Sequence, residues 1–229
     1  MGQNRQQYWI HGNGLSSKSL PKGVLGDDLY GHGDNNWNLG KYSIKRLTQL
    51  FIQKIPFEAH VVGHSLGGHI AINVALARPD ISVTALGMIP ANTLEEAFAG
   101  INPTPEFQAF ASSKRNYQDL VNLASLFTRD LNSQSLFLNS MVKQDPMFSE
   151  TLFSKGFETY DWNEKEKIAN LGQDRFKLVI NDLDPLINFD VAQSQSIQMK
   201  TVLRSHYGHC PWTPRCQVNK QNQEQSLQF

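Results

Sequence analysis

The residues most able to do chemistry lie in Gly63-His64-Ser65-Leu66-Gly67, where a serine stands between two glycines. β-prone residues precede this stretch, and the good helix formers of 70–77 follow it. A Gly-x-Ser-x-Gly pattern between a strand and a helix indicates a nucleophile elbow, a sharp turn that exposes the serine hydroxyl. The turn also aims the first amide of the helix, that of Leu66, at the place where a negative oxygen forms during acyl transfer. Such spacings also occur by chance in turns, so the flanking strand and helix carry the prediction.

A second loop has the composition to help this serine. The short β-prone run Tyr8-Trp9-Ile10 ends in the glycine-punctuated loop 11–17. A loop after an early strand can supply a second backbone amide to the developing oxyanion, and Asn13 is the candidate donor. The alternative is a plain turn.

A nucleophilic serine needs a base, and the base needs an acid behind it. The run 176–180 predicts a strand, and Asn181-Asp182-Leu183-Asp184-Pro185 follows at its carboxyl end. Asp184 is the favoured acid and Asp182 the second choice. Both aspartates can instead form a turn or cap a helix.

The base is expected after the last strand, predicted at 201–203. His209 fits better than His206, because Gly208 and Pro211 bracket it in a turn. Serine, acid and histidine then follow one another along the chain in an order known for catalytic triads. No metal or cofactor is required by this chemistry.

Alternating elements must position these side chains. Apolar residues at helical spacing predict a helix over 41–55, with Ser43 as N-cap and Pro56 as its stop. Strands are expected at 24–29 and 81–89, and the turn Gly31-His32-Gly33 is interpreted as structural. Strands alternating with helices of this length predict an α/β fold, a mostly parallel sheet with helices on both faces and ligands at the carboxyl ends of the strands.

The composition changes between 90 and 170, where β-branched runs give way to short helical patterns. We therefore expect one core domain formed by 1–89 and 171–229, and a helical lid formed by 90–170. The lid needs a core of its own, but some of its aromatic residues should face an apolar cleft below it. Its eight phenylalanines are Phe98, Phe107, Phe110, Phe127, Phe137, Phe148, Phe153 and Phe157.

Composition bounds the setting of the protein. The 229 residues carry 21 basic and 21 acidic side chains, which removes a general electrostatic case for nucleic acid or membrane surfaces. The first residues lack an apolar signal core, so we expect a cytoplasmic protein, and a monomer. Cys210 and Cys216 are interpreted as reduced thiols. The glutamine-rich tail 214–229 is expected to form one helix with a frayed end.

Together these motifs resemble the α/β-hydrolase family. The motifs that stand in family order are His11-Gly12-Asn13-Gly14, Gly31-His32-Gly33, Gly63-His64-Ser65-Leu66-Gly67-Gly68, Asp184 and Gly208-His209. The resemblance implies Ser65, Asp184 and His209 as the triad, and the Asn13 and Leu66 amides as the oxyanion hole. It also implies a sheet that lacks the first two strands of the usual fold.

Within that family, the segments 10–16, 181–187 and 209–212 are most similar to the pimeloyl-[acyl-carrier protein] methyl ester esterases of biotin synthesis. That resemblance implies a methyl ester substrate, either a small molecule or one bound to an acidic carrier protein. Lys114, Arg115 and Arg129 are candidates for a basic docking patch, or for scattered solvated charges. Alternatives are a general short-chain esterase or lipase, a carbon-carbon bond hydrolase, and a non-catalytic binding homologue of the same fold.

Overall fold

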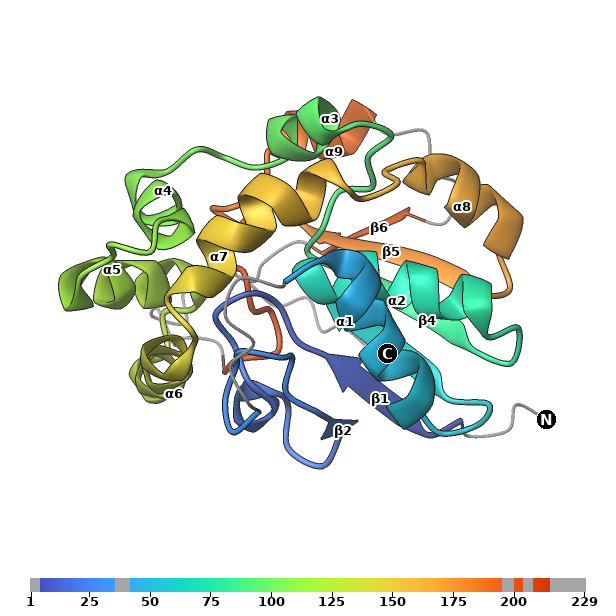
Figure 1. Ribbon diagram of the computed structural model, residues 1–229, viewed down its shortest axis with the longest axis horizontal. Helices are drawn as coiled ribbons and strands as arrows, with labels where there is room; N and C mark the ends of the chain where they lie inside the picture. Colours follow the sequence, from blue (N-terminus) through green and yellow to red (C-terminus); the bar gives the residue numbers. More distant parts are fainter. Residues whose placement is uncertain (1–4, 36–41, 195–199, 204–207, 215–229) are drawn as a thin grey trace, which may run out of the picture.

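The computed structural model of the protein describes residues 5–35, 42–194, 200–203 and 208–214 (Figure 1). Its centre is a six-stranded sheet in the order β2-β1-β3-β4-β5-β6, and every neighbouring pair is parallel. The strands are β1 (Gln7–Ile10), β2 (Leu25–Gly26), β3 (His60–His64), β4 (Ser82–Leu86), β5 (Phe176–Asn181) and β6 (Lys200–Leu203). The carboxyl ends of all these strands therefore lie along one edge, as predicted.

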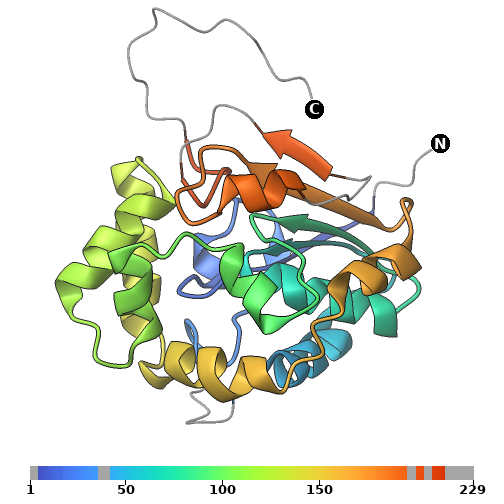
Figure 2. The ribbon, with the colours of Figure 1, turned by 90° about the horizontal axis from the view of Figure 1, so that it is seen from above.

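Helices α1 (Ile44–Lys54) and α2 (Leu66–Ala77) cover one face of the sheet (Figure 2). The prediction for α1 is confirmed: Ser43 is its N-cap and accepts a hydrogen bond from Arg46 N, 3.3 Å. The expected strand over 24–29 pairs only at Leu25 and Gly26, because the chain turns away after these two residues.

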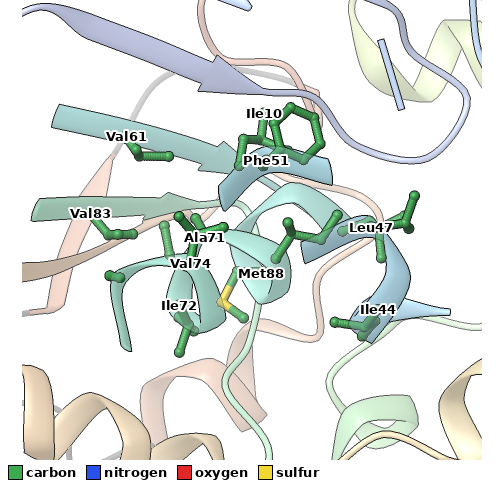
Figure 3. Packing of buried hydrophobic residues seen from close by; sticks show 14 of the residues in the cluster. Ile10, Ile44, Leu47, Phe51, Val61, Ala71, Ile72, Val74, Val83 and Met88 are labelled. Atoms are coloured by element: carbon green, nitrogen blue, oxygen red, sulfur yellow. The ribbon is translucent and has the colours of Figure 1, made fainter. Parts of the chain in front are cut away.

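Alternation along the strands divides the core between the two faces of the sheet. On the α1/α2 face, Ile10, Val61 and Val83 pack with side chains of both helices (Figure 3). On the opposite face, Trp9, Val62 and Leu86 form a smaller cluster. The side chains of Leu20, Val24, Val179 and Trp212 pack against that cluster in the described chain.

The segment 90–170, here called the helical insert, lies between β4 and β5; most of it lies beyond the carboxyl edge of the sheet, and its last helix packs against α2 (Figures 1 and 2). Its elements are α3 (Leu94–Ala99), α4 (Pro105–Ala111), α5 (Tyr117–Phe127), α6 (Leu131–Lys143), α7 (Met147–Thr151), the π-helical turn η2 (Leu152–Gly156) and α8 (Glu164–Leu171). The short elements outside it are η1 (Ser17–Ser19) and α9 (Phe189–Ser194). None of the described helices is both long and apolar enough to cross a lipid bilayer.

The insert shares a cluster of buried residues with Leu15, Leu186 and Cys210, which lie outside it. Phe110, Phe127 and Phe137 are buried in a cluster with Leu123 and Met141. Phe148 is fully buried in the main core instead. The other four phenylalanines of the insert line the cavity described below.

Candidate active site

Ser65 lies at the tip of the predicted turn between β3 and α2. Its φ of 52° and ψ of −120° are a strained conformation for a residue with a side chain. The turn is held by Ser65 N, which donates to Leu86 O at 2.8 Å, and by Gly68 N, which donates to Ser65 O at 2.8 Å. A Cβ on Gly67 would collide with the carbonyl oxygen of Ile10, so the glycine allows α2 to start directly against β1.

His209 and Asp184 form a buried pair at the carboxyl edge of the sheet. His209 Nδ1 lies 2.7 Å from Asp184 Oδ2, and both side chains are at most 5% exposed. Asp184 Oδ1 accepts a second hydrogen bond from Leu186 N at 2.9 Å. Because a carboxylate can only accept, the His209 proton lies on Nδ1, and Nε2 carries a lone pair that can take a proton.

The other two candidates for these roles are not part of the pair. The carboxylate that binds His209 Nδ1 is that of Asp184, whereas Asp182 Oδ1 is buried without a hydrogen-bond partner in the described chain. His206 and Cys216 lie outside the described residues, as does nearly all of the predicted tail helix. Asp184 is therefore the acid that the fold brings to His209.

Backbone contacts fix the position of His209. Its amide donates to Leu126 O at 3.2 Å, so one end of α5 in the insert holds this loop. The carbonyl of His209 accepts from His64 Nε2 at 2.8 Å, and the two rings lie 4.5 Å apart. Burial and the neighbouring His209 hold the pKa of His64 well below its usual range, so His64 stays neutral beside the base.

Ser65, His209, Asn13 and Leu66 line the same cavity. The Ser65 hydroxyl has no hydrogen-bond partner among the described residues, which leaves it available to His209 and a substrate. The amides of Asn13 and Leu66 likewise donate to no acceptor in the described chain, and Leu66 begins α2, where helix N–H groups are unpaired. In the described chain, the cavity that Ser65 lines therefore has two residues whose backbone amides lack an acceptor.

The side chain of Asn13 is held by the helical insert. Its Oδ1 accepts from Gln144 Nε2 at 2.5 Å, and its Nδ2 donates to Ser149 Oγ at 3.0 Å. The next residue, Gly14, donates its amide to His32 Nε2 at 3.2 Å. His32 is fully buried, so the turn interpreted as structural supports the loop that carries Asn13.

The cavity is partly open to solvent and is lined mainly by apolar side chains with a few polar groups, as ligand pockets commonly are. Its polar lining comes from Asn13, Ser65, His69 and His209. The insert supplies most of the apolar wall, formed by Phe98, Phe107, Leu152, Phe153, Phe157 and Trp162. Four of the eight phenylalanines of the insert thus line the cavity, and one of these, Phe157, also belongs to the main core.

The described residues offer few other reactive groups near the serine. No three histidine, cysteine, aspartate or glutamate side chains gather there in a way that could hold a metal ion. Cys210 is a buried free thiol, and its burial raises its pKa well above the usual range, so it is a packing residue.

Sequence reasoning missed the supporting residues of this site. His64 stands beside Ser65 in the motif, but nothing in the motif indicates that it binds the His209 carbonyl. Gln144 and Ser149 carry no sequence signal, because their contacts with Asn13 join segments more than 130 residues apart. His69 was likewise missed in the cavity wall.

Fold and site together define an α/β hydrolase with a serine at its nucleophile elbow position. A model of the Alpha/beta hydrolase family matches residues 10–218, and the chain belongs to this family. It is 25% identical over 197 residues to a pimeloyl-[acyl-carrier protein] methyl ester esterase of Yersinia enterocolitica, covering 81% of this chain and 75% of that protein. It is 24% identical to the protein of the same name from Pectobacterium carotovorum, covering 81% and 76%.

Solved structures give the same fold. The N-acyl homoserine lactonase AidH, complexed with N-butanoyl homoserine, superposes with a TM-score of 0.79 at 20% identity, covering 92% of this chain and 84% of that one. An esterase from Rhodococcus sp. gives a TM-score of 0.66 at 15% identity, covering 90% and 82%.

Proposed function

We propose that the protein hydrolyses carboxylic esters through a covalent acyl-enzyme formed on Ser65. The observation that carries this proposal is the 2.7 Å His209–Asp184 hydrogen bond in the cavity that Ser65 also lines. The relatives named as esterases support the same reaction class.

Each group has a separate task in the proposed reaction. His209 Nε2 removes the proton of Ser65 as its oxygen attacks the ester carbonyl, and Asp184 stabilises the imidazolium that forms. The amides of Asn13 and Leu66 donate to the oxyanion. His209 then protonates the leaving alcohol, and a water activated by the same histidine releases the acid.

The helical insert acts as a lid in this proposal. Its aromatic side chains form an apolar wall over the reacting carbonyl, and the exclusion of bulk water strengthens the hydrogen bonds of the oxyanion. No change of the insert between open and closed forms is needed for this role.

Substitution of Ser65 with alanine tests the proposal. We expect Ser65→Ala and His209→Ala each to lower kcat for p-nitrophenyl butyrate by about three orders of magnitude or more, as in other triads, with the fold intact by circular dichroism. A fluorophosphonate probe should label Ser65 in the parent, as read by mass spectrometry of its peptide. Equal hydrolysis by Ser65→Ala and the parent would refute the mechanism.

The alternatives give different results in the same assays. A non-catalytic binding homologue would label poorly, because its serine would lack a working base. A carbon-carbon bond hydrolase would prefer a ring-cleavage dienoate over simple esters when the two are assayed side by side.

For the substrate we propose a pimeloyl-[acyl-carrier protein] methyl ester, on the basis of the two relatives and the aromatic, apolar wall of the cavity. Arg115, one candidate for a basic docking patch, is half-buried. Its guanidinium carbon lies 4.9 Å from the centroid of the Phe110 ring, and its Nη2 donates to Gln144 O. Docking of an acidic carrier would therefore depend on other basic residues of the insert.

Complementation tests this substrate. The gene should restore growth without biotin to a bacterial strain that lacks its own methyl ester esterase. The purified protein should also cleave the carrier-bound ester faster at low than at high salt. Failure of both, together with good activity on short free esters, would leave a general carboxylesterase.

A further inference from the structure

A second histidine–carboxylate pair lies in the wall of the cavity, apart from the His209–Asp184 pair. Glu164, the first residue of α8, is fully buried. Its carboxylate accepts from His69 Nδ1 at 2.7 Å, from the Tyr160 hydroxyl at 2.9 Å and from Ala91 N at 3.0 Å. A buried polar group is normally hydrogen-bonded, and these three contacts hold the Glu164 carboxyl group in place.

His69 is held from two sides. Its Nδ1 contacts the Glu164 carboxylate, which fixes one edge of the ring. Trp162 packs edge-to-face against the His69 ring, with 5.5 Å between ring centroids, so the ring has one orientation. The second nitrogen, Nε2, has no hydrogen-bond partner in the described chain, although His69 lines the cavity.

The position of His69 relates it directly to the nucleophile. Ser65 is the N-cap of α2, and His69 lies in the first turn of that helix. Both residues line the same cavity, so an ester that reaches Ser65 can also reach His69.

We propose that His69 is a specificity-determining residue, whose Nε2 forms a hydrogen bond with a polar group on the acyl chain of the substrate. Glu164 is its positioning residue, since its contact with Nδ1 fixes the ring. The preferred substrates are thus esters whose acyl chain bears a distal polar group, whereas plain alkanoate esters leave Nε2 unpaired. The inference rests on the proposed ester hydrolysis.

The test compares matched esters that differ only at the distal end. We would measure kcat/KM for monomethyl esters of dicarboxylic acids with four to nine carbons, for their distal amides, and for methyl alkanoates of equal length. The preference for the polar member should be largest at one chain length, the one that brings the distal group to Nε2. His69→Asn should lower that preference by about ten- to a hundredfold, because asparagine can still donate to Glu164 but lacks the atom equivalent to Nε2.

A matched histidine elsewhere provides the control. His60 lies on β3, forms hydrogen bonds to Ser82 and Thr84 through its two ring nitrogens, and does not line the cavity. His60→Asn should keep the preference of the parent. If His69→Asn lowered activity on polar and apolar esters by the same factor, His69 would be merely structural and the inference would fail.

Binding separates this inference from the proposed function. The same ester pairs can be bound to Ser65→Ala with and without His69→Asn, and their Kd values compared by calorimetry. A parent that hydrolyses none of these esters would refute the proposed function. An absence of any polar preference in Kd, or one that His69→Asn leaves unchanged, would refute the role of His69.

Discussion

At the scale of single residues, the contact between His209 Nδ1 and Asp184 Oδ2 decides which of two nearby aspartates can serve the histidine. Asp184 is 5% exposed and uses its other oxygen for the Leu186 amide, so its position is fixed from two sides. Asp182, two residues earlier, has no such contact.

We therefore expect Asp184→Asn to lower kcat for ester hydrolysis by about 10³- to 10⁴-fold, because an amide in that place favours the wrong His209 tautomer. Asp182→Asn should change kcat by less than about tenfold. Steady-state kinetics of both variants with p-nitrophenyl butyrate measure the difference. A larger loss for Asp182→Asn would reverse the assignment.

Much of this residue-scale geometry could be predicted from the sequence. Ser65, Asp184 and His209 each follow a predicted strand, and parallel strands end at one edge, which brings the three residues to one place. The His69–Glu164 pair could not be predicted, because its partners are 95 residues apart and Glu164 sits in an ordinary polar run of α8. No periodicity encodes such a contact across the insert.

At the scale of elements, the helical insert and the loop that carries Asn13 are joined by side-chain hydrogen bonds. Gln144 follows α6 and Ser149 lies in α7, and both hold the Asn13 side chain. Because the side chain is held in this way, the direction of the backbone N–H of Asn13 depends on the packing of the insert. We infer that the insert orients one oxyanion donor as well as covering the cavity.

Ser149→Ala tests this coupling. Loss of a whole oxyanion donor costs about 10²- to 10³-fold in kcat, so a donor that is only loosened should cost about three- to tenfold, with KM changed much less. Ser154→Ala is the matched control, because Ser154 is exposed and bonds only to carbonyls of its own helical segment. Equal kcat values for the two variants would show that the insert does not orient Asn13.

Elements with strong periodicity could be predicted, and weakly patterned ones could not. The apolar spacing of α1 and its Ser43 cap gave bounds close to those of the structure. The run 24–29 is β-prone, but its pairing with β1 stops after Gly26. The next two residues make side-chain hydrogen bonds instead. Asp27 accepts from Tyr8 and Lys54, and Asp28 accepts from the Ser17 amide. The split of the insert's phenylalanines between core and cavity depends on tertiary packing, which helical spacing does not determine.

At the scale of the whole molecule, the core holds an unusual number of neutral histidines. His11, His32 and His64 are fully buried, and their burial lowers the pKa of each below the ordinary value of 6.5. His60, which is half-buried, also has a lowered pKa for the same reason. Each ring accepts or donates hydrogen bonds that suit the neutral form, such as the Leu29 amide to His11 Nε2 at 3.0 Å.

Because of these histidines, we expect the folded protein to become less stable as the pH is lowered through the range in which histidines of the unfolded chain titrate. As pH falls below about 6.5, the unfolded chain takes up protons at these rings and the folded chain does not, so the free energy of unfolding decreases. Each fully buried ring contributes up to about 1.4 kcal/mol per pH unit. Carboxylates with a lowered pKa, such as Asp27, reduce the free energy of unfolding only at more acidic pH, below about 4.

Denaturant unfolding between pH 7 and pH 5 measures this slope. We expect the free energy of unfolding to fall steeply over this range, by several kcal/mol in total if all three rings stay neutral in the folded state. His32→Gln should reduce the slope by about 1.4 kcal/mol per pH unit, since it removes one titrating group, even though it lowers stability at pH 7 by breaking the bond to the Gly14 amide. A profile that is flat from pH 7 to pH 5, or a slope unchanged in His32→Gln, would show that these histidines are protonated in the folded protein.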